Sequence, residues 1–406
     1  MRLDDYSTPI VRVYADCVDL LLQNIARHFK FAALDREGVF EWETLKLAEL
    51  GQLRRENLRI IAQTIGDISG MTELALEKTM SRAFSKNLPE LLQGVDAGLL
   101  SAPALGLSDS MQGILQYYSD QAVRQFNLVN TVMLTSSENA MRRLISTVAR
   151  TQEFLRDVAQ GALNTVTGEV LTGISGRQAA VRSAIRQMAQ EGIVGFVDKA
   201  GHLWSPEAYV NMDVRTTAGN VAREAVFQQN REYGVDLVIV PVNAIARPKC
   251  APYQGKIISM SNGSGYTTDR DGNRVAYIPV GQTSYGEPDG LWGINCHHSP
   301  PDPFIPGISK QHEKPCDAVA DNFTATQRQR YYEREVRNAK RVATCYDAAG
   351  DKEAFQQAAK TVKERTARLK TYCIQHHLPY YGDRVQVFGY GRSQASKATW
   401  AAKRQK

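Results

Sequence analysis

The sequence Gly-Ile-Asn-Cys-His-His occupies residues 293–298, and it sets the expectation for how the middle of the chain folds. A second cysteine, Cys250, lies 46 positions before Cys296, in the segment Ala-Arg-Pro-Lys-Cys-Ala-Pro-Tyr-Gln-Gly-Lys at 246–256. Thiolate and imidazole groups are the usual ligands of structural zinc sites, and they also occur in polar clusters without metal. We therefore expect the two segments to meet as a local cross-link inside a compact core that is rich in β-structure.

Zinc is the one cofactor that this pattern suggests, and its expected ligands are Cys250, Cys296 and His298, with His297 or His312 in the fourth position. Neighbouring side chains on a strand point to opposite faces, so Cys296 and His298 would share one face, which favours that pair. The spacing is not a paired Cys-x-x-Cys signature, and a polar cluster without metal is the main alternative.

Two further interpretations of the same residues stay open. A disulfide between Cys250 and Cys296 is one, although the expected reducing compartment argues against it. The other is an enzyme in which a neighbouring histidine activates Cys296 as a nucleophile. Neither a Gly-rich oxyanion loop nor a third orienting residue can be assigned, so we expect no enzymatic activity.

The composition indicates an ordinary globular protein. A chain of 406 residues is long enough for two or three domains, and 43% hydrophobic residues are enough for a sizeable core. Six scattered cysteines are too few for a disulfide-stapled secreted scaffold, which favours a reducing cytoplasm during synthesis. The first residues are polar rather than a signal peptide, and no apolar run reaches about 18 residues, so we expect no membrane contact.

Helical regions are expected at both ends of the chain. In residues 1–165, apolar residues recur at three- and four-residue spacing, as at Val18, Leu21 and Leu22, and this predicts a helical region. In residues 322–406, two such patterns joined at Ala348-Ala-Gly-Asp-Lys predict a helical hairpin followed by a flexible tail.

A mixed α/β core is expected in between, at residues 166–310. A long helix begins at Ser205 and ends near Tyr233, and a buried strand follows at 235–242. Short strands are expected at 256–260 and 275–280, and the Gly/Ser/Asp-rich stretch 261–273 is expected to be an exposed turn or flap. The predicted fold class is therefore α+β.

The C-terminal region is strongly basic. Residues 322–406 contain 18 Lys and Arg against 7 Asp and Glu, a net charge of +11, so the rest of the chain carries −5 of the total +6. Lys and Arg bind phosphates without regard to sequence, and either DNA or an acidic protein surface fits this charge. The candidate nucleic-acid-binding residues are Arg328, Arg330, Arg334, Arg337, Lys340, Arg341, Lys363, Arg365, Arg368 and Lys370.

Four stretches of the chain resemble a known family. They are Met-Asp-Val-Arg-Thr-Thr-Ala-Gly-Asn at 212–220 with Glu-Tyr-Gly-Val-Asp-Leu-Val at 232–238, the Cys250 segment at 246–256, Thr-Ser-Tyr-Gly-Glu-Pro-Asp-Gly-Leu-Trp-Gly-Ile-Asn-Cys-His-His at 283–298, and Gln-Arg-Gln-Arg-Tyr-Tyr-Glu-Arg-Glu-Val-Arg at 327–337. Together they are similar to the minor capsid protein 2 family of phages, which is itself similar to the MuF-like head-morphogenesis proteins. The resemblance covers roughly residues 165–390. It implies that Arg247, Pro248, Gly255, Gly293 and Asn295 are motif residues and that the core is MuF-like.

Two positions depart from the family pattern. Cys250 stands where the family often has histidine, which keeps an atom able to bind metal. His297 stands where the family usually has arginine, so the role of that arginine does not transfer to this chain.

The resemblance implies a structural function. Proteins of this family are minor components of the phage head, at or near the portal vertex and inside the capsid. They act in head morphogenesis and in genome packaging or delivery. Their expected partners are the portal and capsid or scaffold proteins and non-specifically bound packaged DNA. The expected location is the interior of the virion head, with the host cytoplasm during assembly. A hydrolase that is delivered with the virion and depends on Cys296 and His298 is the alternative.

Overall fold

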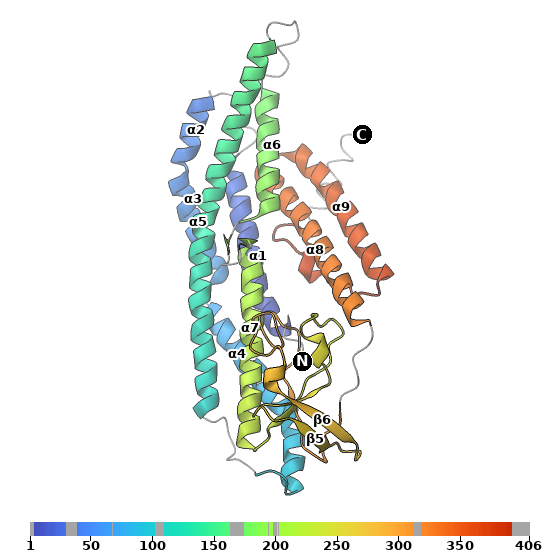
Figure 1. Cartoon of the computed structure of the whole chain (residues 1–406). Helices are drawn as coiled ribbons and strands as arrows, with labels where there is room; N and C mark the ends of the chain where they lie inside the picture. Colours follow the sequence, from blue (N-terminus) through green and yellow to red (C-terminus); the bar gives the residue numbers. More distant parts are fainter. Residues whose placement is uncertain are drawn as a thin grey trace. The chain divides into compact units, whose positions relative to one another are not determined.

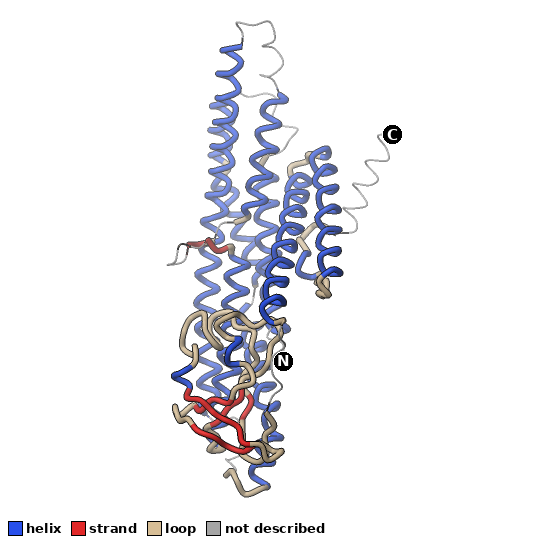
Figure 2. Tube along the Cα trace, turned by 45° about the vertical axis from the view of Figure 1, so that its right-hand side comes forward, coloured by secondary structure: helices blue, strands red, loops and turns tan. Residues whose placement is uncertain are grey.

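The computed structural model describes residues 4–29, 39–66, 68–101, 109–162, 174–193, 195–197, 201, 203–311 and 318–391. The chain is an α+β protein, mainly helical with a small mixed sheet (Figure 1, Figure 2). Its contacts divide it into two compact units, each built from three stretches of chain. Unit 1 contains Met1–Val11, Asp67–Asn127 and Tyr209–Gln327, and unit 2 contains Arg12–Gly66, Leu128–Ala208 and Arg328–Lys406. The division into consecutive regions 1–165, 166–310 and 322–406 stays a prediction.

The helices of unit 1 pack through a seam of small and apolar residues. The unit contains α4 (Ile68–Asp96), the beginning of α5 (Asp109–Ala162) and nearly all of α7 (Pro206–Glu232). Ala218, Val221 and Ala225 recur on α7 at three- and four-residue spacing and pack against α4 and α5. The predicted long helix is confirmed as α7, and the hydroxyl of Ser205 accepts a hydrogen bond from the backbone N–H of Ala208 at 3.3 Å.

The sheet of unit 1 has five strands in the order β5-β6-β4-β3-β7. Their bounds are β3 Leu237–Ile239, β4 Ile257–Ser259, β5 Gly265–Thr268, β6 Arg274–Pro279 and β7 Asp302–Pro303. Strands β4 and β6 are parallel, and the other neighbouring pairs are antiparallel. The strands predicted near 235–242, 256–260 and 275–280 are confirmed as β3, β4 and β6.

The central strands of this sheet are apolar on both faces. Ile239 and Ile257 belong to a cluster with Phe304 on one face. Val238 and Ile258 belong to a second cluster on the other face, which contains Cys250, Cys296 and Phe227 of α7. The cysteine-containing segments therefore lie against the sheet and the C-terminal part of α7. Two short 3₁₀ helices, η2 (Ala251–Tyr253) and η3 (Val280–Gln282), lie in the loops that connect the strands of this sheet.

The stretch 261–273 is partly a strand, so the expectation of an exposed turn throughout was wrong. Its residues Tyr266, Thr267 and Thr268 pair with β6, and Thr and Tyr are good strand formers. The turn is confined to the end of the hairpin, where the Asp269 carboxylate accepts hydrogen bonds from the backbone N–H groups of Asp271 at 3.0 Å and Asn273 at 2.8 Å. A single aspartate therefore stabilises a turn that is shorter than the composition of the stretch predicted.

Unit 2 is built from helices at both ends of the chain. Its elements are most of α1 (Asp4–Arg27), α2 (Val39–Ala48), α3 (Leu50–Ile65), the later part of α5, α6 (Ile174–Glu191), the hairpin β1 (Phe196–Val197) with β2 (Leu203–Trp204), most of α8 (Val319–Ala348), α9 (Lys352–Gln375) and η4 (Asp383–Val385). The apolar face predicted for α1 is confirmed, because Val18, Leu21 and Leu22 are fully buried.

Helices α8 and α9 form the expected antiparallel hairpin (Figure 1). Val336 of α8 packs with Leu369 and Cys373 of α9, and Arg365 donates to the carbonyl of Glu335 at 3.0 Å. The Asp351 carboxylate caps α9 by accepting from the backbone N–H of Ala354 at 3.1 Å. No helix in the described part of the chain has the length and apolar character needed to cross a membrane.

Candidate functional site

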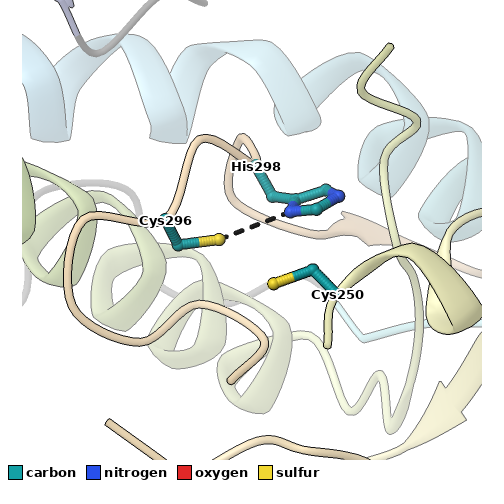
Figure 3. A group of neighbouring side chains, drawn as sticks. All are labelled: Cys250, Cys296 and His298. Carbon is teal, nitrogen blue, oxygen red and sulfur yellow. Dashed lines mark hydrogen bonds between the residues drawn. The ribbon is translucent and has the colours of Figure 1, made fainter. Parts of the chain in front are cut away.

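Cys250, Cys296 and His298 meet in the core of unit 1, as the sequence predicts (Figure 3). Their Sγ, Sγ and ring-nitrogen atoms all lie within 4.8 Å of one another. The Sγ of Cys296 is 3.3 Å from Nδ1 of His298. The three residues are 0%, 7% and 3% exposed, so bulk water has little access to the group.

Two backbone turns aim these side chains at each other. Cys250 ends a turn in which its N–H donates to the carbonyl of Arg247 at 2.9 Å, and η2 begins directly after it. Cys296 ends a second turn, with its N–H bound to the carbonyl of Gly293 at 3.1 Å. Asn295, which lies between Gly293 and Cys296, has a positive φ of 58°, a conformation that asparagine tolerates better than most residues. The quoted motif thus specifies a tight turn that presents Cys296.

Arg247 joins the two turns. Its Nη1 donates to the carbonyl of Ile294 at 2.9 Å, and its Nη2 donates to the carbonyl of Gly290 at 3.0 Å. The planar guanidinium suits such paired contacts, whereas the compact ammonium of lysine would not span both carbonyls. Arg247 therefore holds the Cys250 segment against the loop that carries Cys296.

The other motif residues also have structural positions. A Cβ on Gly293 would lie 2.5 Å from the carbonyl oxygen of Pro288, so only glycine fits there. Gly255 has a φ of +72° and donates its N–H to Val240 at 2.9 Å, which starts the approach to β4. Asn295 accepts from Nη1 of Arg215 on α7 at 2.8 Å, while Pro248 is exposed beside the Arg247 turn. These contacts tie the loop to α7 and the sheet.

His298 is oriented by a residue that the sequence analysis did not single out. Its Nε2 lies 3.3 Å from Oε1 of Gln254, and the same oxygen accepts a hydrogen bond from the backbone N–H of Asn243. An amide oxygen can only accept, so Nε2 of His298 is the donor in this contact and Nδ1 is directed toward the Sγ of Cys296. Gln254 lies within the quoted Cys250 segment, but no feature of its spacing reveals this role.

The two thiols differ in their acidity. The hydrogen bond with Cys250 lowers the pKa of Cys296, against the opposing effect of burial, and His298 lowers it further. The same contact and burial raise the pKa of Cys250. Of the two thiols, Cys296 is therefore the one that loses its proton more readily. Both residues are free cysteines in the structure.

Neither His297 nor His312, the two residues proposed as the fourth ligand, is seen in the cluster of described residues. His297 is not part of the cluster, and its Nε2 lies 3.4 Å from Nη1 of Arg215. Its carbonyl accepts from Nδ2 of Asn243 at 2.8 Å. His312 lies outside the described residues. The structure therefore groups three of the five candidate ligands and places His297 in a separate contact with α7.

A small cavity adjoins the cluster. Its volume is about 10 Å³, and its lining includes Arg215, Thr216, Arg223, Trp292, Cys296 and His298. This is the size of about one water molecule. The cavity has room for little more than a water molecule beside the Cys296 sulfur, so the geometry favours a metal ion or a polar cluster over a nucleophile that acts on a substrate.

The basic residues predicted to bind nucleic acid fall into two groups in unit 2. Arg341 is only 6% exposed and pairs with Asp19 at 2.7 Å and Glu207 at 2.8 Å. Arg337 and Lys340 donate to backbone carbonyls of Arg384 and Val385 at 2.8 Å and 2.6 Å. These three contribute to the fold.

The remaining candidates lie nearer the surface. Arg328 and Arg368 stack on the ring of Tyr332 at 5.3 Å and 4.8 Å. Arg330 and Arg365 are half-buried, and the exposed members are Arg328, Arg334, Lys363, Arg368 and Lys370. The exposed members are the residues through which an anionic partner can be contacted.

Known proteins provide an independent comparison. Residues 1–373 match the family described as Phage minor capsid protein 2. A curated relative from Lactococcus phage LL-H, named Structural protein, is 26% identical over 345 residues, which cover 83% of this chain and 86% of the relative. No solved structure matches the chain. With 373 of its 406 residues inside the family match, the chain belongs to the phage minor capsid protein 2 family and is a structural phage protein.

Proposed function

We propose that this protein is a minor component of the phage head, located at or near the portal in the capsid interior. There it acts in head morphogenesis and in genome packaging or delivery, without catalytic turnover. The observation that carries the proposal is the family match over residues 1–373, and the name of the Lactococcus phage LL-H relative points the same way. The polar side chains of the motif segments make hydrogen bonds within the protein. This supports a structural role rather than an enzymatic one.

The proposed roles of the regions follow the chain. The helical N-terminal region docks on portal, capsid or scaffold proteins, and the central core is MuF-like and serves as a rigid body. The support for the core is the order of its motif segments and the way Arg247 and Gly293 lock them together. The exposed apolar side chains on α2, α3 and α4, among them Leu45, Leu58 and Leu74, support a protein-binding role for the N-terminal part.

The basic hairpin α8–α9 is proposed to face the packaged DNA. The exposed residues Arg334, Lys363 and Lys370 are available for phosphate contacts, which are independent of sequence. Tyr331 is 41% exposed beside Arg328 and adds a flat aromatic surface at the same place. A protein that lies against tightly packed DNA needs such a surface to neutralise phosphates without reading bases.

Cross-linking mass spectrometry of purified heads tests the location. We expect cross-links from lysines of this chain to the portal protein, together with protection of the chain from protease added outside intact heads. Cross-links only to tail proteins, or digestion of the chain in intact heads, would contradict the proposal.

A further inference from the structure

We propose that Cys250, Cys296 and His298 bind one zinc ion through Sγ, Sγ and Nδ1, with the fourth position taken by a water molecule in the adjoining cavity. The metal would pin the Cys250 turn to the Cys296 loop in the core of unit 1. This site is independent of where the protein lies in the head.

The distances between the ligand atoms suit such an ion. Zinc–sulfur and zinc–nitrogen bonds of about 2.3 Å and 2.0 Å in a tetrahedron place the ligand atoms roughly 3.5–3.8 Å apart. The observed Cys296 Sγ to His298 Nδ1 distance is 3.3 Å, and all three ligand atoms lie within 4.8 Å of one another. Small side-chain rotations, without movement of the backbone, are therefore enough to accept the ion.

The surroundings of His298 have the form expected around a metal ligand. A histidine that binds metal through one ring nitrogen usually donates the other N–H to an oxygen that fixes its orientation. Gln254 supplies that oxygen at 3.3 Å from Nε2 and is itself held by the backbone N–H of Asn243. Nδ1 is thereby turned toward the two sulfur atoms before any ion binds (Figure 3).

The donor set selects the metal. Two thiolates and an imidazole are soft or borderline ligands, which favour zinc and disfavour calcium or magnesium. Two thiolates neutralise the double charge of the ion, and this matters because all three residues are buried among apolar neighbours such as Val238 and Ile258.

The cavity explains why three protein ligands are enough. Cys296 and His298 both line it, and its volume of about 10 Å³ is close to that of one water molecule. Arg223 lines the same cavity, and its Nε is buried without a hydrogen-bond acceptor among the described residues. A metal-bound water in the cavity would offer an oxygen to such a donor.

The first experiment measures metal in the full chain, purified without chelators, by elemental mass spectrometry. We expect about one zinc per chain, with most of it lost in Cys250→Ala and Cys296→Ala. Cys345→Ala is the matched control, because Cys345 is also fully buried but lies in unit 2, and it should keep its zinc. Cobalt in place of zinc should give the thiolate charge-transfer bands and strong visible bands of four-coordination in the wild-type chain.

The second experiment keeps the proposal falsifiable if the cysteine variants do not fold. Gln254→Leu removes the oxygen that faces Nε2 and should weaken zinc binding by about 10- to 100-fold, while Gln254→Glu should retain it. The wild-type chain holding no zinc after incubation with the metal, and showing no thiolate bands with cobalt, would overturn the proposal and leave a metal-free polar cluster. That result would not affect the proposed head location, which the cross-linking experiment tests separately.

Discussion

Arg341 shows how much of the fold depends on single buried charges. Its side chain lies between Asp19 of α1 and Glu207 of α7, and the three side chains are 7%, 1% and 13% exposed. Burial raises the pKa of Asp19 despite the facing guanidinium. For Glu207, burial also acts upward, but Arg341, a backbone hydrogen bond and Arg337 together outweigh it and lower the pKa. Both carboxylates therefore need this one partner.

Arg341→Met is expected to destabilise the protein strongly. The substitution removes the cation that pairs with both buried carboxylates, and breaking a buried pair in this way costs about 3–5 kcal/mol. Urea unfolding at neutral pH measures the loss. Arg334→Met, at an exposed position on the same helix, is the control and should change the free energy of unfolding by about 0.5 kcal/mol or less. Equal stability of the two variants would contradict the structural role of Arg341.

Asp213 on α7 is expected to make stability depend on pH. Burial raises its pKa from 3.8 to about 6, and its Oδ2 has no hydrogen-bond partner among the described residues. The folded state thus binds this proton more tightly than the unfolded state. Its contribution to stability is present below pH 4 and is lost as the pH rises through about 6.

Asp213→Asn removes the charge that is costly to bury. We expect the variant to be about 1–3 kcal/mol more stable than wild type at pH 8, with the gain shrinking toward zero at pH 4. Urea unfolding between these pH values measures this difference. Glu77→Gln, at an exposed position of α4, serves as control and should show no such dependence. A gain for Asp213→Asn that is constant with pH would show that burial of the charge is not its cause.

At the scale of elements, the helices followed directly from the sequence because their signals are local. The apolar spacing of Val18, Leu21 and Leu22 identified α1, and Ser205 marked the start of α7. Strand β5 was missed because the glycines and serines before Tyr266 resemble a loop, and its pairing partner β6 lies later in the chain. Pairing across a turn is a tertiary property that composition does not encode.

The hairpin α8–α9 gives a prediction at the same scale. Replacing the exposed residues Arg334, Lys363 and Lys370 together by Gln should weaken binding to duplex DNA and reduce the salt dependence of binding. Each lost phosphate contact reduces the magnitude of the negative slope of log affinity against log salt by about 0.9. Fluorescence anisotropy with duplexes of unrelated sequence measures both quantities.

A matched triple variant controls for net charge alone. Arg55, Arg59 and Lys78 are also exposed but lie on α3 and α4, so their replacement by Gln should leave DNA binding nearly unchanged. Equal weakening by both triple variants would show that the hairpin has no special role. DNA binding that both variants leave intact would remove the hairpin as a DNA-facing surface.

At the scale of the whole molecule, residues far apart in sequence are joined within each unit. In unit 2, Gln23 donates to the carbonyl of Phe388 at 2.8 Å across 365 positions. In unit 1, the Cys250 and Cys296 turns meet through Arg247. The approach of Cys250 and Cys296 could be predicted because thiols and imidazoles are rare and chemically distinctive. The hydrogen bond from Gln23 to Phe388 could not be predicted, because the sequence does not indicate which distant carbonyl a glutamine binds.

The same reasoning explains which site residues the sequence could identify. Cys250, Cys296 and His298 were found by residue type, and the alternation of faces separated His298 from His297. Gln254 was missed because an amide acquires its role only from the position of the imidazole. For Arg341, charge alone suggested a DNA contact, whereas the structure places it in an internal ion pair that depends on the packing of α1 against α8.

The central claim is that this chain is a building part of the phage head, and quantitative mass spectrometry of purified, tail-free heads tests it most directly. We predict that the chain is present in DNA-filled heads at a few copies for each portal, far below the major capsid protein. Its absence from such heads, with abundant protein in the lysate of the same infected cells, would contradict the account.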